Sequence, residues 1–172
     1  SDLWGDPDPP MGSILYIRKC PPRSGDTLFA NMYAAYEALS DRMKAYLDGL
    51  TARHDGEHYR GQYKNFGIQD KESYPSADHP VVRTHPETGR KCLFLGDHAE
   101  YIVGMPYDEG RALIEELNAL AVHPDLTYEH RWRERELILW DNRCVMHRAT
   151  AYEAAGEARV IRRCTVLGEV PA

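Results

Sequence analysis

One histidine of this sequence stands out for the chemistry it could do. His147 lies in the stretch WDNRCVMHRAT, directly after the strand-like run ELILW and before a polar segment. A side chain at such a strand end has a rigid backbone beneath it and can reach into a cavity. Two interpretations are open: an ordinary histidine on a half-buried strand, or one ligand of a metal site. Iron sites with two histidines and one carboxylate leave three positions open for substrate and oxygen.

Three arginines follow within the strand-like run RVIRRCTVLG. Because side chains alternate along a strand, Arg159 and Arg163 share one face and Arg162 points to the other. If the shared face is interior, both guanidinium groups need anionic partners, since unpaired buried charge is costly. The planar guanidinium group suits carboxylates and sulfonates. The alternative is that both arginines face solvent, and composition alone favours it.

The remaining histidines and the cysteines are weaker candidates. His54 and His58 have the i, i+4 spacing of a metal pair on a helix, but their glycine-rich surroundings argue against a helix. His79 and His85 each precede a proline, which favours packing in a turn. The cysteines form no C-x-x-C pair and match no zinc spacing, so we expect reduced thiols at positions 20, 92, 144 and 164.

The elements that position these residues can be predicted from the hydrophobic pattern. Strands are expected at residues 11–20, 26–30, 126–134, 136–142 and 159–168, with two more around the Pro-Glu-Thr-Gly turn within 79–96. Helices are expected at 31–40, at a following segment capped by Ser40 or Asp41, and at 107–123. The polar stretch from Gly56 to Asp78 predicts a long, mobile loop that borders the substrate entrance. Many short strands with few helices predict a mainly β sandwich or barrel with inserted helices.

The bulk properties exclude several classes of protein. A chain of 172 residues can form one domain with a substantial core, and no repeat or linker indicates a second. The net charge of -6 argues against a nucleic-acid binder. No apolar run approaches the ~20 residues that cross a bilayer, and no leader is visible, so we expect a cytoplasmic protein without a membrane partner. The opening residues SDLWGDPDPP lack an initiator methionine, as expected of a chain that begins within a longer one.

Several stretches together resemble a known family. GDTLFANMYAAYEALS, HPVVRTHPETGRK, HRW…ELILWDNRCVMHRAT and RVIRRCTVLG closely resemble the taurine dioxygenase and 2,4-dichlorophenoxyacetate dioxygenase family, in family order and at family spacing. The resemblance runs from Ser1 to about Gly168. Members are iron(II)- and 2-oxoglutarate-dependent oxygenases with a double-stranded β-helix, or jelly-roll, core. It implies that residues 1–172 form a single catalytic domain, the C-terminal portion of a longer dioxygenase domain, and that the N-terminal part of the family fold is absent.

The resemblance also assigns site residues. The family's distal iron histidine matches His147, and its His-x-Asp motif ends at Asp2. Thr27, in the Gly-Asp-Thr motif, and Arg159 match residues that bind 2-oxoglutarate. Arg163 matches the arginine that holds the anionic group of the substrate. One departure stands out: the first metal histidine would immediately precede Ser1 and is absent.

These assignments imply a function. We expect an Fe(II)- and 2-oxoglutarate-dependent dioxygenase that uses O₂ to hydroxylate a small organic anion, phenoxyalkanoate-like or sulfonate-like, with release of succinate and CO₂. The stretch GDHAEYIVGMPYDEGRALIEEL resembles the phenoxyacetate branch more than the taurine branch. The alternative is a non-catalytic jelly-roll module that binds small anions and has lost its metal site; the residue before Ser1 would discriminate the two. Assembly into a homo-oligomer is left open.

Overall fold

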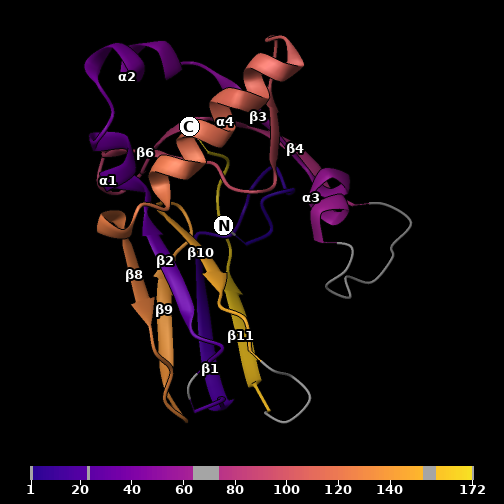
Figure 1. The fold of residues 1–172 in the computed structure, drawn as a ribbon, viewed down its shortest axis with the longest axis vertical. Helices are drawn as coiled ribbons and strands as arrows, with labels where there is room; N and C mark the ends of the chain where they lie inside the picture. Colours follow the sequence, from indigo (N-terminus) through magenta and orange to yellow (C-terminus); the bar gives the residue numbers. More distant parts are fainter. Residues whose placement is uncertain (1, 23, 64–73, 153–157, 172) are drawn as a thin grey trace.

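The structure divides into a half built from two small sheets and a half built from helices and short strands. The computed structural model describes residues 2–22, 24–63, 74–152 and 158–171. In Figure 1 the longer strands run side by side through the lower half of the molecule, and helices cover the top. The architecture is mainly β and of the jelly-roll type, which confirms the predicted fold class.

Two antiparallel, three-stranded sheets form the lower half. The first has the order β11–β1–β9, and its strands are Val160–Val166, Gly12–Lys19 and Leu137–Asp141. The second has the order β10–β2–β8, and its strands are Val145–Ala149, Thr27–Asn31 and Thr127–His130. Strands β9 and β10 are consecutive in the chain but lie in different sheets, so the turn between them links the two.

The upper half contains the other strands and the helices. A third sheet has the order β4–β3–β7, with strands Ser76–Pro80, Thr51–Asp55 and Ala99–Ile102. Val82–Thr84 and Lys91–Leu93 pair as β5 and β6. The helices are α1 Met32–Glu37, α2 Asp41–Leu47, α3 Gly56–Tyr63 and α4 Tyr107–Ala121, and a 3₁₀ turn spans Pro124–Leu126.

The apolar core lies in this upper half. Helix α4 turns Ile114 and Leu117 inward, as its 3.6-residue periodicity predicts. Gly110 lets α4 approach β7 closely, because a Cβ atom there would lie 2.9 Å from the backbone nitrogen of Ile102. The fully buried members of the core include Ala35, Leu47, Ala52, Val81, Cys92, Leu93, Ala99 and Ile102.

Most predicted elements are present, with two corrections. The tail holds a fourth strand, β10, which carries His147. The predicted loop from Gly56 to Asp78 instead begins with α3 and ends in β4, and its residues 64–73 lie outside the described residues. Helix α3 forms despite its glycines, because the Asp55 carboxylate accepts the backbone N–H groups of Glu57 and His58.

The argument against a metal pair at the i, i+4 histidines is confirmed. His54 lies on β3 and His58 lies on α3, so the two do not form a pair on one helix. The cysteines at 20, 92, 144 and 164 are free thiols, as expected. Within the described ranges, no helix has the length and apolar character that would let it cross a membrane.

Candidate functional site

A cavity of about 990 Å³ lies between the two lower sheets. Its walls come from both sheets and from the segment that precedes β1. All the site residues expected from the sequence line this one cavity, although they come from distant parts of the chain: Asp2, Thr27, His147, Arg159 and Arg163.

Asp2 and His147 face each other inside the cavity. The Oδ1 atom of Asp2 lies 3.7 Å from Nε2 of His147, too far for a hydrogen bond. With bonds of roughly 2.1 Å, two ligands of one divalent cation lie about 3.0 Å apart at an octahedral angle and about 3.4 Å apart at a tetrahedral angle, so a small approach of the two side chains would complete the pair. Burial lowers the pKa of His147 to about 4, so the imidazole is neutral at pH 7 and can present a lone pair. The donor set therefore fits a metal ion.

The carboxylate of Asp2 has a different partner on each oxygen. The Ser13 hydroxyl donates a hydrogen bond to Oδ2. Nη1 of Arg163 donates to Oδ1 at 3.0 Å. The Arg163 side chain is 50% exposed, so it makes this contact from the solvent-accessible part of the cavity.

Arg163 and Arg162 point to opposite faces of β11, as strand alternation predicts. Arg163 pairs in register with Leu15 of β1, and both line the cavity. Arg162 pairs with Tyr16, and neither of these lines it. Arg159 lies one residue before β11 begins, but its side chain still lines the cavity.

The Gly-Asp-Thr segment positions Arg159 and Thr27 together. Gly25 has a φ of 71°, and a Cβ atom on it would lie 3.1 Å from Cδ of Arg159, so a side chain there would be strained and crowded. Nε of Arg159 donates to the Gly25 carbonyl at 2.9 Å. Thr27 Oγ1 accepts the indole N–H of Trp132 at 3.0 Å, which leaves the threonine hydroxyl hydrogen available for a ligand.

Sequence reasoning missed part of the cavity wall. His98 is buried there, with its ring stacked on Trp4 at 4.6 Å, and burial lowers its pKa well below the usual value. Tyr59 of α3 also lines the cavity. Neither residue was singled out from the sequence, although His98 lies in the stretch that resembles the phenoxyacetate branch, because only the tertiary packing of the segments brings them to the site.

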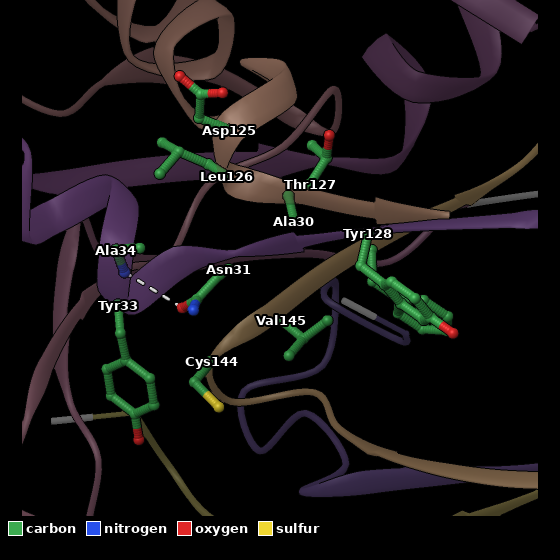
Figure 2. Close-up of a pocket in the computed structure, with 11 residues that line it drawn as sticks. Ala30, Asn31, Tyr33, Ala34, Asp125, Leu126, Thr127, Tyr128, Cys144 and Val145 are labelled. Atoms are coloured by element: carbon green, nitrogen blue, oxygen red, sulfur yellow. Dashed lines mark hydrogen bonds between the residues drawn. The ribbon is translucent and has the colours of Figure 1, made fainter. Parts of the chain in front are cut away.

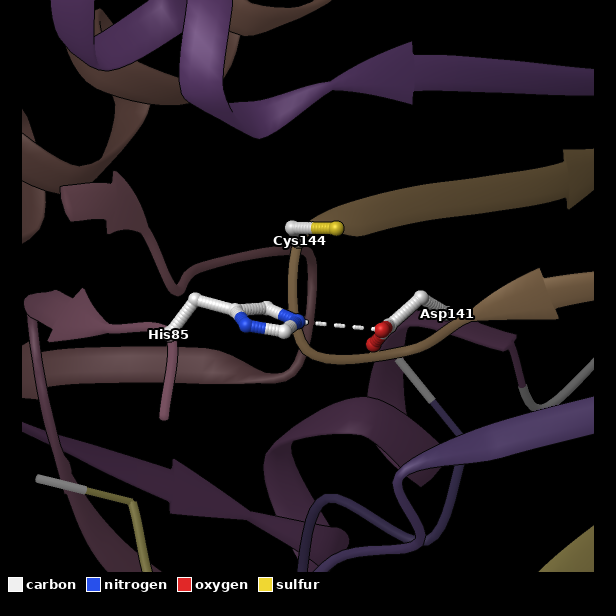
Figure 3. A group of neighbouring side chains, drawn as sticks. All are labelled: His85, Asp141 and Cys144. Carbon is white, nitrogen blue, oxygen red and sulfur yellow. Dashed lines mark hydrogen bonds and ion pairs between the residues drawn. The ribbon is translucent and has the colours of Figure 1, made fainter. Parts of the chain in front are cut away.

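A second group of possible metal ligands lies outside this cavity. Figure 3 shows His85, Asp141 and Cys144, whose candidate ligand atoms all lie within 4.8 Å of one another. However, Arg143 donates to both oxygens of Asp141, from Nε at 2.9 Å and from Nη2 at 2.7 Å. A cation would have to displace this guanidinium group, so the arrangement is that of a structural ion pair. His85 also accepts backbone N–H groups of the following turn, as its proline neighbour indicated.

A smaller hollow of about 420 Å³ lies beside α1, β2 and β8. Figure 2 shows the side chains that line it. Its polar groups serve local structure: Asn31 caps α1 by accepting the Ala34 backbone N–H at 3.1 Å, and the Tyr33 hydroxyl is hydrogen-bonded to Thr88. This hollow therefore offers less chemistry than the larger cavity.

Comparison with known proteins gives a consistent result. The family model described as "Taurine catabolism dioxygenase TauD, TfdA family" matches residues 1–165. The chain is 42% identical over 159 residues to an alpha-ketoglutarate-dependent 2,4-dichlorophenoxyacetate dioxygenase of Burkholderia sp. (strain RASC), covering 91% of this chain and 53% of that protein. It is 35% identical over 170 residues to an (S)-phenoxypropionate/alpha-ketoglutarate-dioxygenase of Sphingobium herbicidovorans, covering 92% of this chain and 58% of that protein.

Solved structures agree with these matches. The crystal structure of AAD-2 in complex with Mn(II) and N-oxalylglycine aligns with a TM-score of 0.90 at 38% identity, covering 99% of this chain and 68% of that chain. A taurine dioxygenase from Burkholderia xenovorans aligns with a TM-score of 0.85 at 32% identity, covering 97% and 55%. The chain spans about half the length of the curated relatives it matches.

Proposed function

Because the chain belongs to the TauD, TfdA family of taurine catabolism dioxygenases, we propose that it forms the catalytic C-terminal portion of an Fe(II)- and 2-oxoglutarate-dependent dioxygenase that hydroxylates a small organic anion. In this proposal residues 1–172 belong to a single catalytic domain. One observation carries it: three distant segments of the chain meet in a single cavity. They bring Asp2, His147 and the arginine pair Arg159 and Arg163 together there.

Asp2 and His147 would hold the iron. The neutral imidazole and the carboxylate are suitable ligands for Fe(II), and the third ligand of the family, a histidine, would lie directly before Ser1. Bound iron would supply the oxygen chemistry of the family, in which 2-oxoglutarate is oxidised to succinate and CO₂ while the substrate is hydroxylated. The task of the chain itself is to bind and orient the reactants beside these two ligands.

Arg159 and Thr27 would hold the distal carboxylate of 2-oxoglutarate. The Nε atom of Arg159 is already used by the Gly25 carbonyl, so the side chain is fixed while its terminal nitrogens bond to none of the described residues. Those nitrogens can form a charge-assisted pair with a carboxylate. The Thr27 hydroxyl, whose oxygen accepts from Trp132, can donate to the same carboxylate.

Arg163 would bind the anionic group of the substrate. Among the described residues its hydrogen bond from Nη1 goes to Asp2, and its half-exposed side chain lets it turn toward a ligand that enters the cavity. Relatives named for 2,4-dichlorophenoxyacetate, (S)-phenoxypropionate and sulfonates all point to anionic substrates. We propose a phenoxyalkanoate-like or sulfonate-like substrate on this ground.

The test is succinate formation by the whole protein with Fe(II) and 2-oxoglutarate. Phenoxyacetate, a short alkylsulfonate and the neutral phenoxyacetamide would be compared as substrates. We expect Fe(II)-dependent succinate formation that one of the anions stimulates and the amide does not. Binding of 2-oxoglutarate without any succinate would contradict the proposal and favour the non-catalytic anion-binding module.

A further inference from the structure

A buried series of hydrogen bonds leads from Trp140 to the metal-ligand candidate Asp2. The indole N–H of Trp140 donates to Oδ1 of Asn142 at 2.8 Å. Nδ2 of Asn142 donates to Oγ of Ser13 at 2.9 Å. The Ser13 hydroxyl in turn donates to Oδ2 of Asp2. Ser13 is 0% exposed and Asn142 is 2% exposed, so water cannot replace these partners.

The Trp140 indole N–H, where the series begins, determines the direction of all three hydrogen bonds. An indole N–H can only donate, so the Asn142 oxygen must face Trp140 and its NH₂ group must face Ser13. The Ser13 oxygen then accepts from Asn142, which leaves the hydroxyl hydrogen for the carboxylate of Asp2. Without the indole N–H, the amide of Asn142 could rotate by 180° and present its oxygen to Ser13. The Ser13 hydroxyl would then have a competing acceptor.

Trp140 also contacts the other metal-ligand candidate. Its ring centroid lies 4.8 Å from that of His147 at an interplanar angle of 59°, and 5.5 Å from that of Phe29. Strand pairing creates this arrangement, because Trp140 of β9 lies opposite Ser13 of β1 while His147 of β10 lies opposite Phe29 of β2. One indole therefore supports Asp2 through hydrogen bonds and His147 through packing.

We propose that Trp140, Asn142 and Ser13 are positioning residues that fix Asp2 for metal binding; this inference rests on the proposed function. With Oδ2 held by Ser13, Oδ1 is the carboxylate oxygen turned toward Nε2 of His147; Arg163 also donates to Oδ1, and its half-exposed guanidinium group would turn away when a metal ion binds. The hydrogen bonds thus select one oxygen as the ligand and keep it from rotating away. Residues behind metal ligands typically change metal affinity by about 10- to 100-fold when they are removed.

The experiment measures the dissociation constant of Mn(II), by electron paramagnetic resonance, for the whole protein. Ser13→Ala removes the donor to Asp2, and Trp140→Phe removes the indole N–H while it keeps a ring against His147. We expect each to weaken Mn(II) binding by about 10- to 100-fold. Because both substitutions interrupt the same series of hydrogen bonds, their effects should not add. The double variant should bind Mn(II) as tightly as the single variant with the lower affinity.

Ser76→Ala is the matched control. Ser76 donates to Oδ2 of Asp55 at 2.9 Å, so this variant also removes a serine–carboxylate hydrogen bond, but Asp55 does not line the cavity. Its Mn(II) affinity should equal that of the wild type. If Ser13→Ala does not fold, Trp140→Phe and Asn142→Asp carry the test, because the introduced carboxylate cannot donate to Ser13 and would compete with Asp2 for the hydroxyl hydrogen.

The possible outcomes separate the two proposals. If the wild type binds Mn(II) and the variants have dissociation constants within twofold of it, the positioning role is overturned and the proposed function stands. Losses that multiply in the double variant would also overturn it, because they would mean that Trp140 acts through packing on His147 alone. Wild-type protein that binds no Mn(II) would contradict the proposed function, and this inference with it.

Discussion

Two groups in this molecule have the same composition, with one histidine, one aspartate and one arginine each, but their hydrogen bonding differs. In the first, Asp141 is bonded on both oxygens: Arg143 donates from its backbone nitrogen, from Nε and from Nη2, and His85 lies 3.0 Å from Oδ2. Arg143 is only 5% exposed and also pairs with Glu87 at 3.0 Å. Every strong acceptor position in this group has a partner.

In the second group, Asp2 with His147 and Arg163, the histidine and the arginine are less tightly held than in the first. Arg163 makes one contact with Asp2 and is half exposed. His147 stands 3.7 Å from the carboxylate, and its buried Nδ1 has no partner among the residues that the structure describes. The capacity to bind a metal ion therefore does not follow from residue types alone. It follows from which donors and acceptors the fold leaves available beside a cavity.

The largest expected effect is the difference in turnover between His147→Ala and His85→Ala. His147→Ala should lower Fe(II)-dependent succinate formation by on the order of 10³-fold or more, because a metal ligand costs more than the residues behind it. His85→Ala should keep turnover within about threefold and lower the melting temperature, because it removes a partner of a buried ion pair. Succinate assays and thermal unfolding of both variants provide the measurements.

The reverse pattern would contradict the comparison. An active His147→Ala variant would remove the metal assignment from the large cavity. An inactive but folded His85→Ala variant would move the chemistry to the group in Figure 3.

Replacement of Arg159 and replacement of Arg163 should raise KM for different ligands. Loss of a hydrogen bond to a charged group costs about 1.5–3 kcal/mol, or roughly 10- to 100-fold in affinity. Arg159→Ala should raise KM for 2-oxoglutarate by that factor. Arg163→Ala should raise KM for the anionic substrate, affect a neutral analogue much less, and leave uncoupled 2-oxoglutarate decarboxylation largely intact. Steady-state kinetics with each ligand varied in turn measure both effects.

Arg162→Ala is the control on the opposite face of β11. It should leave both KM values unchanged, because Arg162 does not line the cavity. If Arg163→Ala and Arg159→Ala both change only KM for 2-oxoglutarate, Arg163 does not bind the substrate, and the inference of an anionic substrate fails.

Local patterns were sufficient to predict much of the framework. The alternation along residues 159–168 placed Arg163 and Arg162 on opposite faces, and the periodicity of residues 107–123 identified the buried face of α4. The start of α2 was also predicted, with Ser40 and Asp41 both left open as its cap; Ser40 is the cap in the structure, where it accepts the Met43 backbone N–H. These features depend only on neighbours within one or two turns of the chain.

The features that were missed depend on long-range contacts. Ser13 is one residue in a strand-like run, and its role follows only from the register that places it opposite Trp140. β10 is short and mixes polar with apolar residues, so its pattern did not predict a strand. Strand registers between distant segments are set by tertiary packing, and no local rule predicts them.

The smallest expected effect is on acid stability, and it concerns the fully bonded group. Burial alone would raise the pKa of Asp141, but hydrogen bonds from Arg143 and His85 outweigh it and lower the pKa from 3.8 to about 2. A carboxyl group with a lower pKa in the folded state stabilises the fold above its unfolded pKa and loses that contribution as the pH falls. The contribution, on the order of 2 kcal/mol, should therefore be complete near pH 5 and disappear between about pH 4 and pH 2.

Asp141→Asn tests this directly, because the amide cannot titrate. The free energy of unfolding, measured with urea at pH 5 and at pH 2.5, should decrease less between the two values for the variant than for the wild type. The other carboxyl groups and the histidines are present in both proteins, so their titration largely cancels in this comparison. Asp41→Asn is the control, since the Asp41 carboxylate is fully exposed and its replacement should leave the wild-type decrease unchanged. An equal decrease in Asp141→Asn and wild type would mean that the ion pair between Asp141 and Arg143 adds nothing to stability. The contrast between this structural group and the candidate metal-binding group would then have no energetic basis.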